Sequence, residues 1–164
     1  MKYLVVLFFT FMIRAQSIST LDVEAALIFR IAPFVDQNIY DDTKFCILGS
    51  PRYEIYDVLK SNVENKMLGS KKVSVSKVSN STIKNSKCSI LILPNKVAVD
   101  SLQKILSETQ GLIIISLNNE NHVLSHFVLK RVENKIKFDA NIKKIKDDDV
   151  KISSKLLRLA DRTY

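Results

Sequence analysis

The sequence predicts a single α/β domain built as a three-layer sandwich, with a partly parallel central sheet, a C-terminal β-hairpin and a terminal helix. Three observations predict this class. Continuous apolar runs at 45–49, 88–93 and 112–117 are typical of strands buried on both faces. Segments with helical spacing of apolar residues separate these runs, as parallel strands require. Two strand-like runs flank Glu133-Asn134 in a hairpin pattern.

The first element of the domain is predicted to be a helix over 21–35. Its apolar residues recur every three or four positions, and Ser19 or Thr20 is available as N-cap. Pro33 lies near its end, where it kinks or terminates the helix. The other elements are expected in the order strand 45–49, helix 52–63, strand 72–78, strand 88–93, helix 97–108, strand 112–117, hairpin 127–141 and helix 149–162.

The beginning of the chain is typical of a secretory signal peptide over residues 1–17. A positive start, Met1-Lys2, precedes an apolar run of eleven residues at 3–13, which is too short to span a bilayer. Cleavage after Ser17 or after Ala15 would leave a mature domain of about 18–164. A buried N-terminal strand is the alternative. We therefore expect an exported, periplasmic protein without direct membrane insertion.

The positive charge of the chain is concentrated near its C-terminus. The net charge is +8, and residues 130–164 carry 11 basic and 6 acidic side chains. Such a surface suits nucleic acid, anionic lipid or an acidic protein surface, and export disfavours nucleic acid. Lys143, Lys144 and Lys146 are expected to steer association with an acidic partner. A solvated face of a terminal helix is the alternative.

The sequence offers no recognisable catalytic, cofactor or metal residues, so we predict that the protein is not an enzyme. Its three isolated glycines cannot form a phosphate cradle. His122 and His126 straddle a loop and the start of a strand, so we expect surface histidines rather than a metal pair. The run Asp147-Asp148-Asp149 precedes a predicted helix, where carboxylates cap free N–H groups.

Two alternatives remain open at this point. The two cysteines either pair, as even-numbered cysteines usually do after export, or pack as buried free thiols. The domain is either a protein-binding regulator or a periplasmic small-molecule-binding module. In the second case its ligand would lie in a crevice at the carboxyl ends of the parallel strands, lined by Gly49-Ser50-Pro51 and Leu93-Pro94-Asn95.

Five segments in order carry a family resemblance: 24–29 (E-A-A-L-I-F), 45–49 (F-C-I-L-G), 88–91 (C-S-I-L), 135–141 (K-I-K-F-D-A-N) and 151–160 (K-I-S-S-K-L-L-R-L-A). Behind a leader and at this length, they resemble the YfiR-like family of small periplasmic regulators. The resemblance implies one α/β domain, typically dimeric, that acts without catalysis. It also implies a partner, an inner-membrane signalling protein such as a diguanylate cyclase, which makes cyclic-di-GMP, or a sensor kinase, whose activity the domain restrains.

The resemblance also assigns residues. It implies that Cys46 and Cys88 are a structural disulfide pair. If the first and third strands are neighbours and the register allows it, the two cysteines are within bridging reach. The signature segment 153–157 supplies the candidate partner-binding residues: Ser153, Ser154, Lys155 and Leu157. Pure packing is the alternative for this segment, because Ile152, Leu156, Leu159 and Ala160 recur at helical spacing.

Overall fold

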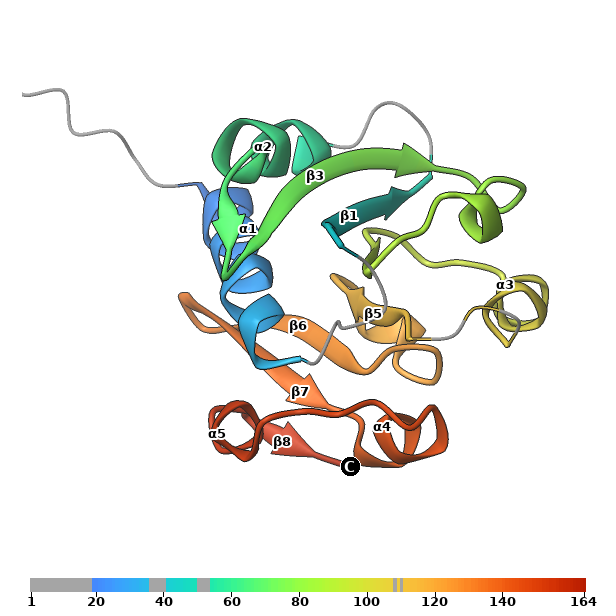
Figure 1. Ribbon diagram of the computed structural model, residues 1–164. Coiled ribbons are helices and arrows are strands. Elements are labelled where there is room, and N and C mark those ends of the chain that lie inside the picture. The colour runs from blue at the N-terminus through green and yellow to red at the C-terminus, as the bar shows by residue number, and fades with distance from the viewer. Residues whose placement is uncertain (1–18, 36–40, 50–53, 108, 110) are drawn as a thin grey trace, which may run out of the picture.

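The computed structural model describes residues 19–35, 41–49, 54–107, 109 and 111–164. The expected signal peptide, 1–17, lies outside the described residues. The described residues form an eight-stranded mixed sheet in the order β2-β3-β1-β4-β5-β6-β7-β8 (Figure 1). Its strands are β1 (Thr43–Leu48), β2 (Met67–Leu68), β3 (Lys71–Val78), β4 (Ile90–Leu93), β5 (Ile113–Ser116), β6 (Phe127–Val132), β7 (Lys135–Ala140) and β8 (Arg162–Thr163).

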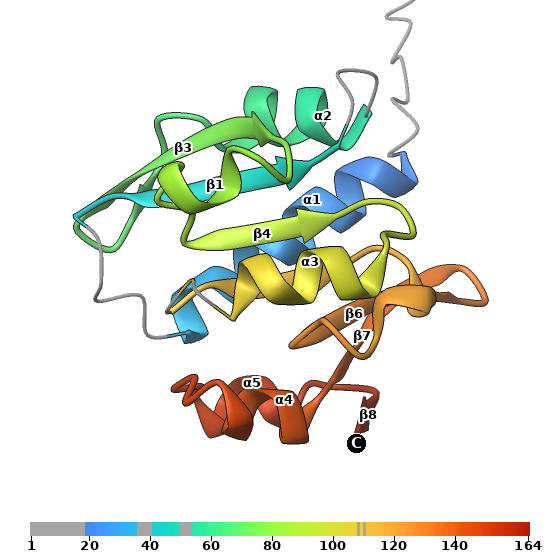
Figure 2. The same cartoon turned by 90° about the vertical axis from the view of Figure 1, so that its right-hand side faces the viewer.

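The helices lie on both faces of this sheet, which confirms the predicted α/β sandwich. They are α1 (Thr20–Ile31), α2 (Glu54–Val63), α3 (Val99–Leu106), α4 (Ile142–Asp147) and α5 (Ser154–Leu157), with short 3-10 turns η1 (Ala32–Phe34), η2 (Ile83–Asn85) and η3 (Asn119–Asn121). Helices α1 and α2 cover one face, and α3 covers the other. Figure 2 looks onto the α3 side, with β4 and then α1 behind it.

Two apolar cores separate these layers. Phe45, Ile47 and the inward residues of α1 and α2 belong to one core, whereas Leu91 and Leu102 belong to the other. Neighbouring residues of a strand point to opposite faces, so a strand buried on both sides needs apolar side chains throughout. That requirement explains the continuous apolar runs in the sequence.

Helix α1 begins with a reciprocal cap. Asp22 N–H donates to Ser19 Oγ at 3.1 Å, and Ser19 N–H donates to the Asp22 carboxylate at 3.1 Å. The buried stripe of the helix is Ala25, Ile28 and Ile31, spaced by three residues, while Val23 is 40% exposed. The chain tightens into η1 at Pro33, as expected for a proline near a helix end.

The structure places the predicted strands 45–49 and 88–93 side by side, as the disulfide hypothesis requires. Strand β1 lies between β3 and β4 in parallel register, with Phe45 opposite Ile90. The predicted first and third long strands are therefore neighbours. The hairpin is also confirmed, because β6 pairs antiparallel with β7 around a turn in which Glu133 has a positive φ of 54°.

The end of the chain differs from the expectation of one helix over 149–162. Helix α4 ends at Asp147, and Asp149 adopts a left-handed φ of 49°, which breaks helical continuity. The second helix, α5, is four residues long, and β8 then pairs parallel with β7. Leu159, expected to pack against the sheet, is 68% exposed. Helical spacing over 152–160 therefore does not describe one continuous buried face.

Candidate functional site

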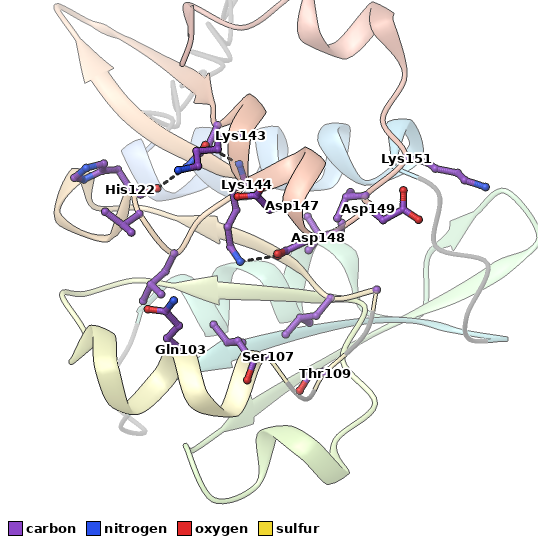
Figure 3. A pocket seen from close by; sticks show the side chains of 18 of the residues that line it. Gln103, Ser107, Thr109, His122, Lys143, Lys144, Asp147, Asp148, Asp149 and Lys151 are labelled. Carbon is purple, nitrogen blue, oxygen red and sulfur yellow. Dashed lines mark hydrogen bonds and ion pairs between the residues drawn. The ribbon is translucent and has the colours of Figure 1, made fainter.

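A groove of about 1140 Å³ lies between α3, the start of β5 and α4. Figure 3 shows Gln103 of α3 and Ser107, which follows that helix, across from Lys143 and Lys144 of α4. Three carboxylates, Asp147, Asp148 and Asp149, complete the α4 side of this first groove. Its lining therefore mixes both charges, and Lys144 Nζ lies 2.6 Å from Asp148 Oδ2.

This groove opens at the amino edge of the parallel strands. Neither it nor the second groove described below is lined by Gly49 or by residues 93–95, where the sequence predicted a crevice at the carboxyl edge. At that edge, η3 contributes a buried side chain. Asn121 is fully buried, its Nδ2 donates to Asn95 O at 2.7 Å, and Val97 N–H donates to its Oδ1 at 3.1 Å. These bonds hold the turn after β4 against η3. Ser50 and Pro51 of the other expected turn lie outside the described residues.

His126 lies behind the groove, and the expectation of a surface histidine is wrong for it. Its side chain is fully buried, whereas His122 is exposed as expected. The backbone N–H of Ile114 donates to His126 Nδ1 at 2.9 Å, and the backbone N–H of His126 donates to the carbonyl oxygen of Ile114 at 3.0 Å. An N–H donor at Nδ1 requires that nitrogen to be unprotonated, which puts the ring proton on Nε2.

The proton on Nε2 faces Asp148 Oδ2 at 3.1 Å. Burial lowers the pKa of His126, and this effect outweighs that of the Asp148 carboxylate, which raises the pKa. The buried ring is therefore held in its neutral form. The hydrogen bond from His126, assisted by Lys144, lowers the pKa of Asp148 to about 2. Both ring nitrogens are thus engaged within the fold. His126 holds β5 and the end of α4 together and has no nitrogen left to accept a proton from a substrate.

The acidic run also corrects an expectation. Asp147 is the last residue of α4, and Asp148 and Asp149 follow it. None of the three caps a following helix, since Asn141 caps α4 through Lys144 N–H and Ser153 caps α5. Asp148 is instead the connection to His126. No sequence signal joins two residues 22 positions apart, although a histidine at the entry to the apolar run 127–129 indicates burial.

A second charged cluster, also missed from the sequence, anchors the C-terminus to the hairpin. The register places Lys130 directly opposite Lys137, a pair of like charges that would repel. Asp161 lies 2.8 Å from Lys130 Nζ and 2.6 Å from Lys137 Nζ, and Asp139 also contacts Lys130 at 2.6 Å. These two lysines lower the pKa of Asp161 to about 2.

The two cysteines form a disulfide, so the alternative of free thiols is excluded. Their Cα atoms are 5.8 Å apart, and both residues are buried within the core on the α3 side. The bond connects β1 to the residue that leads into β4. It encloses α2, β2, β3 and η2, so it connects the parallel half of the sheet covalently.

The candidate partner-binding residues are divided between surface and core. Ser154 and Lys155 are exposed, Ser153 accepts from Lys155 N–H at 3.3 Å, and Leu157 packs against the core on the α1 side. The packing interpretation holds for Leu156, which is buried. Of the basic residues expected to steer a partner, Lys143 and Lys146 are exposed, whereas Lys144 is paired with Asp148.

Two comparisons with known proteins bear on this site. A family model described as YfiR/HmsC-like matches residues 21–161. The match includes both cysteines, His126, Asp148 and the segment 153–157. A search of curated proteins found no match to the chain. Among the described residues, no helix combines the length and apolar character needed to cross a membrane.

Proposed function

The chain belongs to the YfiR/HmsC-like family, and from this membership we propose that it is a non-enzymatic periplasmic regulator. It binds and restrains an inner-membrane signalling protein, either a diguanylate cyclase that makes cyclic-di-GMP or a sensor kinase. The observation that carries this proposal is the family match over 21–161, nearly the whole domain. In this proposal residues 1–17 are the export signal, residues 18–164 are the regulatory domain, and a homodimer is its working form.

The geometry of the polar groups supports a binding role. The buried His126 and the exposed Asp148 have the composition of a catalytic dyad, yet Nδ1 accepts a backbone N–H and Nε2 donates to the carboxylate. A general base needs a free lone pair directed at its substrate. The pair therefore serves to position α4, which supports the proposal that the domain acts by recognition through its surface.

We place the partner contact at the surface of segment 153–157. Ser154 and Lys155 are exposed, and the buried Leu156 beneath them holds the segment to the core. Phe34 O accepts from Ser153 N–H at 2.9 Å, which attaches the segment to the end of α1 as well. An exposed, basic segment held in this way is preorganised for an acidic periplasmic surface.

The test is site-directed photo-crosslinking in cells, with the photoreactive residue at Ser154 in one strain and at Lys135 in a matched control. Both positions are exposed, and Lys135 lies on the hairpin. We expect Ser154 to capture one membrane protein that carries a cyclase or kinase domain, identified by mass spectrometry. Capture of the same protein at equal yield from Lys135, or capture of no such protein from Ser154, would contradict the proposal.

A further inference from the structure

A second groove of about 660 Å³ lies at the amino edge of β1 and β3 and shares Lys151 with the first groove. One wall is η1 with Val35, and the facing wall is the segment leading into α5. Backbone contacts hold these walls together, because Val35 forms an antiparallel bridge with Ile152 and Ser153 N–H donates to Phe34 O. Its volume falls in the range of roughly 300–1,000 Å³ that is typical of small-ligand sites.

The charges of this second groove are of one sign. The charged residues among its described lining are Lys71, Lys151 and Lys155, with no carboxylate. Lys151 and Lys155 are exposed, and neither forms an ion pair within the described part of the chain. In the first groove, by contrast, Lys144 is neutralised by Asp148. Lys151 and Lys155 thus bring to the second groove positive charge that no ion pair within the described residues neutralises.

A buried polar atom lies at the same place. Thr43 is 1% exposed and forms part of the groove lining, yet its Oγ1 has no hydrogen-bond partner among the residues that the structure describes. An unsatisfied buried hydroxyl is unusual in a folded protein, because leaving it unpaired costs about 1–3 kcal/mol. A ligand oxygen in the groove would supply the missing partner.

The remaining lining is apolar. Phe34, Leu68 and Ile152 are half-buried and line the groove while packing on the core below. A ligand that matches the whole groove therefore needs an anionic group for the lysines and an apolar body for these three side chains. Lysine ammonium groups act as point charges that suit phosphate, whereas planar carboxylates favour the bidentate fork of arginine, which the described lining lacks.

We propose that the second groove is a binding site for a phosphate group carried on an apolar body. Lys151 and Lys155 bind the phosphate oxygens, the Thr43 hydroxyl donates to a ligand oxygen, and Phe34, Leu68 and Ile152 contact the apolar part. Such a group occurs on soluble phosphate esters and on anionic phospholipids. This site goes beyond the regulator function proposed above and does not depend on it.

The test uses 1-naphthyl phosphate as the probe, with inorganic phosphate and 1-naphthol as its separate halves, in isothermal titrations of the intact protein. We expect the whole probe to bind more tightly than either half. Lys155→Gln and Thr43→Val should each weaken binding about threefold to tenfold, the range for one hydrogen bond or charge. Lys143→Gln, which removes the same charge from the first groove only, is the matched control and should bind as the parent protein does.

Circular dichroism and thermal melts establish that each variant is folded before titration. The proposal is overturned if the probe does not bind, if Thr43→Val and Lys155→Gln bind as tightly as the parent, or if Lys143→Gln weakens binding equally. Vesicles of phosphatidylcholine, with and without phosphatidylglycerol, identify the source. Cosedimentation that needs phosphatidylglycerol and is competed by 1-naphthyl phosphate assigns a lipid headgroup, and probe binding without cosedimentation assigns a soluble ester.

Discussion

The two halves of the sheet are stabilised by different chemistry. The parallel half, β3-β1-β4-β5, is held by continuous apolar packing on both faces and by the disulfide between Cys46 and Cys88. The C-terminal half, β6-β7-β8 with α4 and α5, is held to its surroundings by polar contacts, of which the hydrogen bond from His126 to Asp148 and the ion pair Lys130–Asp161 are the main ones. The first half is therefore expected to respond to reduction, and the second to pH and salt.

The largest expected effect is loss of the disulfide from the parallel half. Replacing both residues in Cys46→Ala/Cys88→Ala should lower the free energy of unfolding by about 4 kcal/mol, because the bond closes a long loop in the unfolded chain. Urea denaturation of the variant and the parent protein measures this loss. Added reductant should destabilise only the parent protein. Equal stability of the two proteins would show that the bond constrains nothing.

The next effect concerns His126, which connects β5 of the parallel half to the end of α4 in the C-terminal half. His126→Leu leaves Ile114 N–H buried without an acceptor and removes the donor to Asp148, so we expect a loss of about 1–3 kcal/mol. His122→Leu is the matched control, because His122 is exposed and a surface change is usually within about 0.5 kcal/mol. Urea denaturation of both variants at pH 7.5 measures the loss of unfolding free energy in each. Similar losses would show that His126 does not connect the two halves of the sheet.

The contact between His126 and Asp148 should also make the stability of the protein depend on pH. The pKa of His126 is lowered in the folded protein, so between its folded and unfolded pKa values the unfolded chain binds more protons. The contribution of neutral His126 to the free energy of unfolding is then fully present above about pH 6.5, its pKa in the unfolded chain, and is lost as the pH falls towards the lowered pKa of the folded state. Asp148, with a pKa of about 2, adds a further loss below about pH 4. Urea midpoints from pH 7.5 to 5 should fall for the parent protein, and an equally steep fall in His126→Leu would contradict this assignment.

The smallest effect is expected at the surface of the C-terminal half. Asp161→Asn leaves Lys130 and Lys137 facing each other without their shared carboxylate, so the melting temperature should fall slightly. Much of that fall reflects repulsion between lysines, so it should shrink between 20 mM and 500 mM NaCl, concentrations chosen to change screening. Lys135→Gln is the control, because Lys135 lies on β7 like Lys137 but has no contact with Asp161 among the described ion pairs. A salt-independent fall would indicate lost packing instead of charge.

The difference between the halves also explains which predictions from the sequence succeeded. Strands at 45–49, 88–93 and 112–117 were predicted correctly because burial on both faces forces uninterrupted apolar residues. The terminal helix was predicted over 149–162 because Ile152, Leu156 and Leu159 have helical spacing, yet Asp149 in a left-handed turn and β8 divide that segment. A charged, partly exposed segment carries a weak periodic signal, so its contacts to β7 decide its shape.

The candidate sites follow the same division. The pairing of Cys46 with Cys88 was implied by the family resemblance, with free thiols as the alternative, and the structure decides for the disulfide. Burial of His126 and its bond to Asp148 were not predicted, because the two residues are 22 positions apart and meet only when α4 folds back beneath β5. The orphan hydroxyl of Thr43 is equally invisible until β1 and the segment 151–155 share one groove.

The sequence by itself determined the α/β class, the buried strands of the parallel half and the family resemblance, because these depend on patterns within short segments of the chain, whereas the order of the strands came from the structure. Only the tertiary structure decided the path of the last 23 residues, the burial of His126 and the positions of both grooves. The physical reason is the range of the interactions. Apolar burial constrains each residue individually, whereas an ion pair or a groove exists only between residues that folding brings together.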